Sequence, residues 1–181
     1  MRTFYIGIIL ILCSGVILIL GLINKKNNFV GLWTVLKKHL KLFQNARFQY
    51  LLFYIVPLFM AIGISCIYIA DCLMYQNIIV AVSIFVSMLL SMLSILTTKD
   101  YTKYTPEQQK KIKNVLDETN NAIVFCTFVS ILIIIISLVM VAVSSSEEQI
   151  LNRVVAAGIY YLIQVLLLNI LLIVKRVGKL V

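Results

Sequence analysis

Few residues in this chain have side chains that could do catalytic or metal chemistry. The only histidine, His39, stands beside lysines, and as a catalytic base it would need an orienting partner that the sequence does not supply. No pair of cysteines has the spacing of metal ligands. We expect all four to pack as small apolar residues, with Cys72 the one placed to meet an oxidising compartment; they are Cys13, Cys66, Cys72 and Cys126.

The short motifs of enzymes are also missing from the sequence. There is no P-loop, HExxH, CxxC or GxSxG pattern. The long apolar runs contain no Asp, Glu, Lys, Arg or His, which argues against proton relays, charge-coupled transport and voltage sensing. The sequence therefore predicts a protein that is not an enzyme and that uses no cofactor or metal.

Five apolar runs dominate the chain instead. Each is long enough to cross the ~30 Å hydrocarbon core of a bilayer as a helix, and none shows the alternation of barrel strands. Only 13% of all residues are charged, against about 25% in soluble domains. We therefore predict an all-α fold, a polytopic membrane helical bundle of about five transmembrane helices in one domain, residues 1–181. The predicted spans are residues 4–23, 50–70, 77–96, 121–144 and 154–174.

The positive charges predict the orientation of these spans. The net charge is +9, and all basic residues except Arg2 and Arg153 lie in residues 24–49, in residues 97–120 or after residue 174. By the positive-inside rule these three segments are cytoplasmic, which puts the N-terminus outside the membrane and the C-terminus on the cytoplasmic side. No small-x-small cleavage pattern precedes Asn24, which favours a membrane span over a signal peptide for the first run. No direct contact with nucleic acid is predicted.

The segment 24–49 has the pattern of an amphipathic helix on the cytoplasmic membrane surface. Its apolar face is rich in aromatic residues and includes Trp33, and its opposite face carries Lys37, Lys38 and Lys41. The segment is either a linker helix lying on the bilayer or a surface that docks a protein partner or anionic lipid. Its lysines attract anionic lipid in both cases.

The second and third predicted spans are joined by a short connection at residues 71–76. We expect a kink near Pro57, because proline removes a backbone donor from the helix. Gly63 and Ser65 would let a neighbouring helix approach closely. The short connection predicts that these two spans pack together as an antiparallel hairpin.

Polar residues inside the predicted spans suggest contacts between helices. The third span carries a serine ridge, defined as Ser83, Ser87, Ser91 and Ser94, which share one helix face. The ridge is either a seam for helix packing or the polar wall of a pore. The fifth span carries Gln164 and Asn169, whose amides we expect to form hydrogen bonds between helices, within one copy or between copies.

The second cytoplasmic segment, residues 97–120, contains a helix start. Thr105 can cap a helix, Pro106 suits its first position, and Gln108 completes a capping box. We predict a helix that runs from here into the fourth span, to about Val143. An apolar strip on its projecting part contacts either a protein partner or residues 24–49. The strip is Ile112, Val115 and Leu116, flanked by Lys110, Lys111 and Lys113.

Several stretches resemble small multi-span membrane proteins of bacterial anti-phage defence systems, such as the Kiwa-type membrane subunit. They are the proline-containing span, Ser83-Ile84-Phe85-Val86-Ser87-Met88-Leu89-Leu90, Asp117-Glu118-Thr119-Asn120-Asn121 and the terminal Val174-Lys175-Arg176. The resemblance implies an inner-membrane oligomer that works with a cytosolic effector, and it assigns no functional residue.

Three functions fit these observations. The first is a non-enzymatic oligomeric scaffold or sensor that presents its basic cytoplasmic segments to a soluble protein. The second is a pore-forming or membrane-depolarising effector, with the serine ridge along the conduction path. The third is an accessory subunit of a transporter or envelope complex.

Overall fold

The computed structural model of this chain describes residue 37 and residues 51–98, 105–143 and 149–178. These residues are nearly all helical and include no strand. Three helices are long and apolar enough to cross a membrane: α5 (Cys72–Thr98), α6 (Pro106–Val143) and α7 (Gln149–Val177), the last through its segment Asn152–Val177. The predicted all-helical class is thus confirmed, and three of the described helices are compatible with a membrane-embedded protein.

The predicted count of five spans is not supported. Residues 4–23 lie outside the described residues. The predicted span 50–70 becomes a five-residue π-helix, η1 (Leu51–Ile55), followed by the 12-residue α4 (Val56–Ile67). Together they reach only about 25 Å at 1.5 Å per residue, short of a ~30 Å hydrocarbon core.

Pro57 explains the change from η1 to α4. It stands at the start of α4, where its missing N–H leaves carbonyls of the preceding turn without their usual donor. A change of helix type at this point takes the place of a simple kink. The predicted irregularity before Pro57 is therefore present, in the form of a π-turn.

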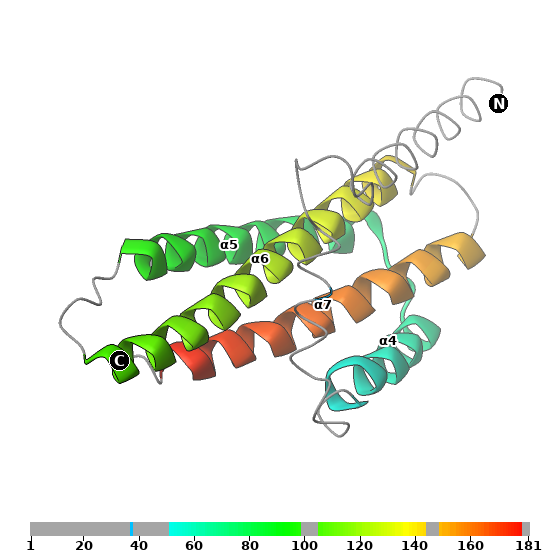
Figure 1. The fold of residues 1–181 in the computed structure, drawn as a ribbon. Helices are drawn as coiled ribbons and strands as arrows, with labels where there is room; N and C mark the ends of the chain where they lie inside the picture. The colour runs from blue at the N-terminus through cyan, green and yellow to red at the C-terminus, as the bar shows by residue number, and fades with distance from the viewer. Residues whose placement is uncertain (1–36, 38–50, 99–104, 144–148, 179–181) are drawn as a thin grey trace, which may run out of the picture.

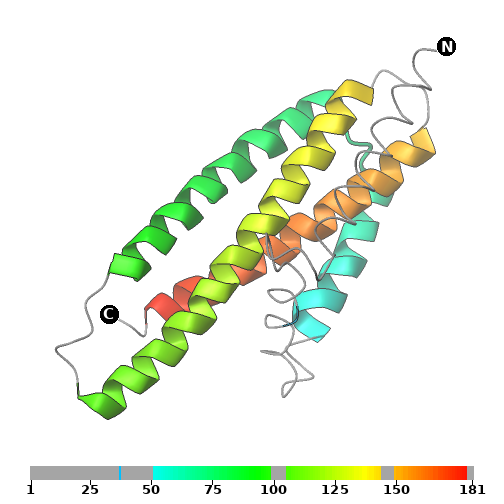
Figure 2. The same cartoon turned by 45° about the horizontal axis from the view of Figure 1, so that its top comes forward.

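The helices pack in the order α5, α6, α7, α4 (Figure 1). α5 runs along α6, α6 crosses α7, and α4 lies against the other side of α7; the turned view in Figure 2 shows the same order. Among the described elements α4 contacts α7 and η1 but neither α5 nor α6. The predicted packing of the second and third spans as a hairpin is therefore wrong.

The corner between α4 and α5 gives the physical reason. Tyr68 follows α4 in an extended conformation, with φ −119° and ψ 130°, so the chain leads away from α4 before it turns. α5 begins at Cys72, earlier than the predicted residue 77. Its N-cap is Asp71, whose Oδ1 accepts a hydrogen bond from the backbone N–H of Met74 at 2.9 Å.

Each long helix buries residues at a spacing of seven. In α5 these are Tyr75, Val82, Leu89 and Leu96. In α6 they form two neighbouring rows, and in α7 the pattern repeats. The rows are Thr119, Cys126, Ile133 and Met140; Ile123, Ser130 and Ser137; and Ile159, Leu166 and Ile173. A repeat of seven is the signature of left-handed, coiled-coil-like helix packing.

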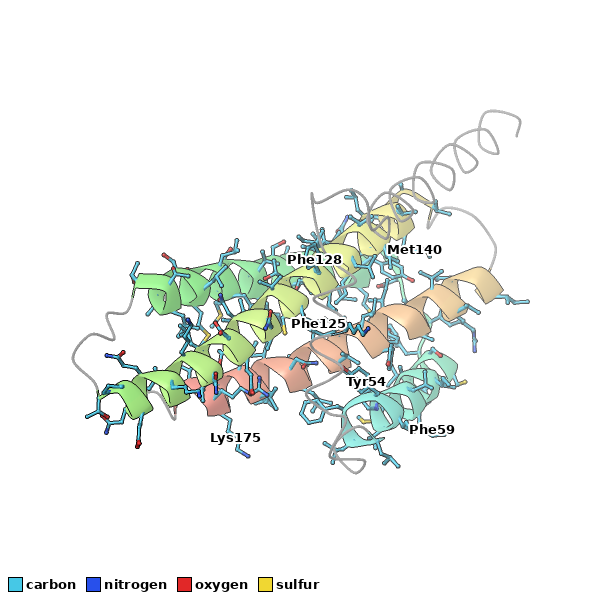
Figure 3. All side chains as sticks on the ribbon, viewed as in Figure 1. Tyr54, Phe59, Phe125, Phe128, Met140 and Lys175 are labelled. Atoms are coloured by element: carbon cyan, nitrogen blue, oxygen red, sulfur yellow. The ribbon has the colours of Figure 1, made fainter. Side chains whose placement is uncertain are left out.

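α4 uses small residues to approach α7. Its buried positions are Pro57, Ala61 and Ser65, four residues apart, and such spacing lets two helices come close. Ser65 thus has the packing role that the sequence suggested. Gly63 does not, because a Cβ at this position would meet nothing within 4 Å. The outer side of α4 is apolar, and Phe59 on it is 70% exposed (Figure 3).

Candidate functional site

The serine ridge lies on the exposed side of α5, away from the row that packs against α6. All four residues are exposed. The hydroxyl groups of Ser83, Ser87 and Ser91 donate to the carbonyls of Ile79, Ser83 and Ser87, at 2.7, 3.1 and 2.9 Å. The carbonyl of Ser94 accepts from Thr97 and Thr98, at 2.9 and 3.2 Å.

These bonds decide what the ridge can offer. Since each of the three hydroxyl protons is used by the α5 backbone, Ser83, Ser87 and Ser91 can face lipid without unpaired donors. It can also receive another helix by close contact of small side chains. None of the other described helices covers it, so the choice between a packing seam and a pore wall stays a prediction.

Two serines that the sequence reasoning did not single out lie inside the bundle. Ser130 and Ser137 on α6 are fully buried, and their hydroxyls have no hydrogen-bond partner within the described part of the chain. In the sequence, only their seven-residue spacing from Ile123 marks Ser130 and Ser137 as buried. This spacing is hard to recognise because most of the neighbouring residues are also apolar. Their small size lets the neighbouring helices of the bundle come close to α6.

The two amides of α7 differ in their surroundings. Asn169 is fully buried, and its Nδ2 donates to the Val165 carbonyl of its own helix at 2.8 Å. Gln164 is half-buried. The side-chain oxygens of both amides accept no hydrogen bond among the described residues. The expected bonds between helices therefore remain a prediction, which residues outside the described ranges or a second copy would have to supply.

The lysine-rich end of the bundle is marked by an ion pair between α6 and α7. Nη2 of Arg176 lies 3.6 Å from Oε2 of Glu118, and its Nη1 donates to the Glu118 carbonyl at 3.3 Å. α7 ends at Val177 just after this contact, whereas α6 extends twelve residues further, back to Pro106. Figure 2 shows this part of α6 continuing past the ends of α5 and α7.

The start of this projecting part matches the predicted capping box. The backbone N–H of Thr105 donates to Oε1 of Gln108 at 3.2 Å, and Pro106 is the first helical residue. α6 then runs without a break to Val143, as predicted. The projecting part is thus continuous with a helix that is long and apolar enough to cross a membrane.

The surface of the projecting helix is mixed. Lys110 and Lys113 are exposed, and the side chain of Lys111 lies outside the described part. The apolar strip is only partly exposed, and Leu116 packs against the core of the bundle. Lys175 at the end of α7 adds a further exposed charge at the same end (Figure 3).

The amphipathic segment 24–49 falls almost wholly outside the described residues. Lys37 is its one described residue, and it is helical and exposed. Trp33, Lys38 and Lys41 lie outside the description. The predicted surface helix is therefore neither confirmed nor contradicted.

The opposite end of the bundle holds a polar cluster that the sequence reasoning missed. Asn152 accepts a hydrogen bond from the Tyr75 hydroxyl, and its Nδ2 donates to the carbonyl of Ala70 at 2.7 Å. Arg153 donates from Nη1 to the carbonyl of Cys66 at 3.4 Å. The start of α7 thereby satisfies backbone carbonyls that the end of α4 and the corner leave without helical partners.

The cysteines offer no metal centre in the described ranges. Cys66, Cys72 and Cys126 are free, and no group of three His, Cys, Asp or Glu side chains comes together there. Cys126 is fully buried in α6.

Comparison of the chain with protein-family models, curated proteins and solved structures gave no match. The proposals on function below therefore draw on the geometry of the described helices and on the sequence.

Proposed function

We propose that this chain is a non-enzymatic, oligomeric membrane scaffold or sensor subunit that presents basic cytoplasmic segments to a soluble protein. The supporting observation is α6, whose 38 residues extend about 57 Å and exceed a ~30 Å hydrocarbon core by a wide margin. The excess is at its N-terminal end, where the helix carries exposed Lys110 and Lys113. A rigid, charged helix end outside the membrane is a suitable contact for a soluble partner.

The proposal includes the full predicted topology. Residues 4–23 and 50–70 would add two spans to the three long helices, with the N-terminus outside and the C-terminus in the cytoplasm of a bacterium. Together η1 and α4 are about 25 Å long and would cross where the bilayer is locally thinned. The distribution of charge supports this orientation, because Lys110, Lys113, Lys175 and Arg176 lie at one end of the bundle. By the positive-inside rule that end is cytoplasmic.

The resemblance to small membrane proteins of anti-phage defence suggests a setting for this scaffold. In that setting the oligomer would sit in the inner membrane and hold or signal to a cytosolic effector. The exposed serine ridge of α5 supports association of copies, because its small side chains allow close helix contact.

Affinity purification in a gentle detergent, followed by native mass determination, tests the proposal. We expect a defined oligomer with a soluble partner in fixed stoichiometry. The double variant Lys110→Glu and Lys113→Glu should lose the partner and keep the oligomer. Ser87→Leu with Ser91→Leu should break the oligomer and leave membrane insertion intact. A homo-oligomer that binds no soluble protein would contradict the scaffold.

A pore is the second candidate, and the exposure of the serine ridge favours it over an accessory transporter subunit. Several copies arranged with α5 inward would line a path with the four serines. Purified protein in planar bilayers should then conduct ions. Under this alternative, Ser87→Leu with Ser91→Leu would abolish the conductance and leave the oligomer intact, the reverse of the scaffold outcome.

A further inference from the structure

Two opposite charges flank the corner between α4 and α5. Asp71 and Arg153 are both exposed, and neither forms an ion pair within the part of the chain that the structure describes. The Asp71 carboxylate uses Oδ1 to cap α5, and the Arg153 guanidinium uses Nη1 on the Cys66 carbonyl. A guanidinium has five N–H donors and a carboxylate has two oxygens, so both groups keep hydrogen-bonding capacity for a further molecule.

A hydrogen bond between their neighbours in the chain holds the two charged residues close together. The Asn152 side chain donates to the carbonyl of Ala70, and these residues directly precede Arg153 and Asp71. The Tyr75 hydroxyl donates to the same Asn152 side chain, which fixes the amide from α5 as well. The corner in Figure 1, where the chain passes from α4 to α5 beside α7, is therefore tied at several points.

The corner also lies where the apolar segments of the bundle end. The candidate spans begin here at Cys72 and Asn152. Beside the charges stand Ile67, which is 89% exposed, and Tyr68, which is 47% exposed. An exposed isoleucine suits the acyl region, and tyrosine is enriched where acyl chains meet headgroups. The corner thus combines charged groups suited to lipid headgroups, an aromatic group suited to the interface and an aliphatic group suited to the acyl chains.

We propose that this corner binds a phospholipid with a zwitterionic headgroup. The Arg153 guanidinium would bind the phosphate, for which its planar donor set is well suited, and the Asp71 carboxylate would bind the ammonium. The acyl chains would lie beside Ile67. An anionic headgroup such as phosphatidylglycerol would meet Arg153 favourably but would gain nothing from Asp71, and the carboxylate would repel it. The inference needs only the membrane setting of the proposed function and not its soluble partner.

Native mass spectrometry of the full chain in mild detergent tests this proposal, with phosphatidylethanolamine and phosphatidylglycerol of identical acyl chains as probes. Asp71→Asn removes the charge and keeps a side-chain oxygen to cap α5. Arg153→Gln removes the charge and keeps a donor for the Cys66 carbonyl. Each should lower retention of phosphatidylethanolamine about two- to five-fold, the range of an exposed ion pair. Asp71→Asn should leave phosphatidylglycerol retained as before or better, and Arg153→Lys should restore phosphatidylethanolamine.

The matched control is Leu132→Ala, an uncharged change at a residue that is 44% exposed on α6 and belongs to neither proposed surface. Thermal midpoints of all variants show whether the fold is kept, and Asp71→Asn carries the test if Arg153→Gln unfolds. Equal phosphatidylethanolamine retention in the wild type, Asp71→Asn and Arg153→Gln would overturn the proposal. An equal loss of both lipids in Asp71→Asn would also overturn it, because a general weakening of the surface does not distinguish headgroups. Loss of the soluble partner leaves this result untouched, so the two proposals fail separately.

Discussion

Serine residues have two different roles in this molecule. On α5 the hydroxyls of Ser83, Ser87 and Ser91 bond to their own helix and face outward. On α6, Ser130 and Ser137 are buried without a partner for their hydroxyls among the described residues. A buried hydroxyl without a partner costs about 1–3 kcal/mol. Position in the helix repeat, and not residue type, therefore decides what each serine contributes.

Replacing the buried hydroxyl tests this view. We expect Ser137→Ala to raise the free energy of unfolding by up to about 1 kcal/mol, because it removes an unpaired polar group and keeps the small volume. Ser87→Ala, where the hydroxyl is bonded and exposed, should change it by less than about 0.5 kcal/mol. Unfolding in detergent followed by circular dichroism provides the measurement. A clear loss of stability in Ser137→Ala would mean that its hydroxyl has a partner.

At the scale of elements, α4 is held on one side only. It packs on α7 through Pro57, Ala61 and Ser65, and neither α5 nor α6 contacts it. Its C-terminal end is fixed by Arg153 on the Cys66 carbonyl. The stability of α4 in the bundle therefore depends on the close fit of its small residues to α7.

A pair of substitutions on α4 measures that dependence. Ala61 is 1% exposed, so Ala61→Leu overpacks the contact with α7 and should cost about 1–3 kcal/mol. Gly63 is exposed and has open space around its Cβ position, so Gly63→Leu should cost nothing and should add up to about 1 kcal/mol of stability through helix propensity. Thermal unfolding of both variants in the same detergent compares them. Similar losses in the two would show that the outer side of α4 is also packed.

The elements also show what the sequence could and could not predict. The start of α6 was predictable because Thr105, Pro106 and Gln108 form a local capping signal. The seven-residue rows were not, because a helix that is apolar all round gives no contrast between its buried and exposed sides. The pairing of α4 with α5 was wrong because a short connection limits distance, not direction, and Tyr68 is extended.

The candidate surfaces divide in the same way. Exposed Lys110 and Lys113 follow from charge, which is visible in the sequence. The cluster around Asn152 and Tyr75 depends on residues 77 positions apart. The two side chains meet only in the folded bundle, where the Tyr75 hydroxyl reaches Asn152 at the start of α7, and no local sequence pattern predicts this contact.

The whole molecule has two chemically different ends. Lysines and arginine gather where α7 ends, and the opposite end has Asp71 and Arg153 at a tied corner. α5 and the apolar part of α7 have 27 and 26 residues, or about 40 Å each, enough for a bilayer core with a turn to spare at each surface. The positive-inside rule predicts the orientation of the molecule from this difference in charge between its two ends.

Fusion reporters check the orientation of the whole molecule. A fluorescent protein joined after residue 181 should fold and fluoresce, because we expect the C-terminus to be cytoplasmic. Alkaline phosphatase joined there should be inactive, and joined after residue 71 it should be active. The reverse result for both reporters would place the lysine-rich end outside the cell.

The unbroken path of α6 has a mechanical consequence. A helix that leaves the bilayer without a joint acts as a lever, and its outer arm of twelve residues before Glu118 is about 18 Å long. Helices change their tilt with the thickness of the membrane. A change in tilt of about 10° would move the tip of this arm sideways by about 3 Å. A soluble protein bound at Pro106 would therefore be displaced by a change in bilayer thickness.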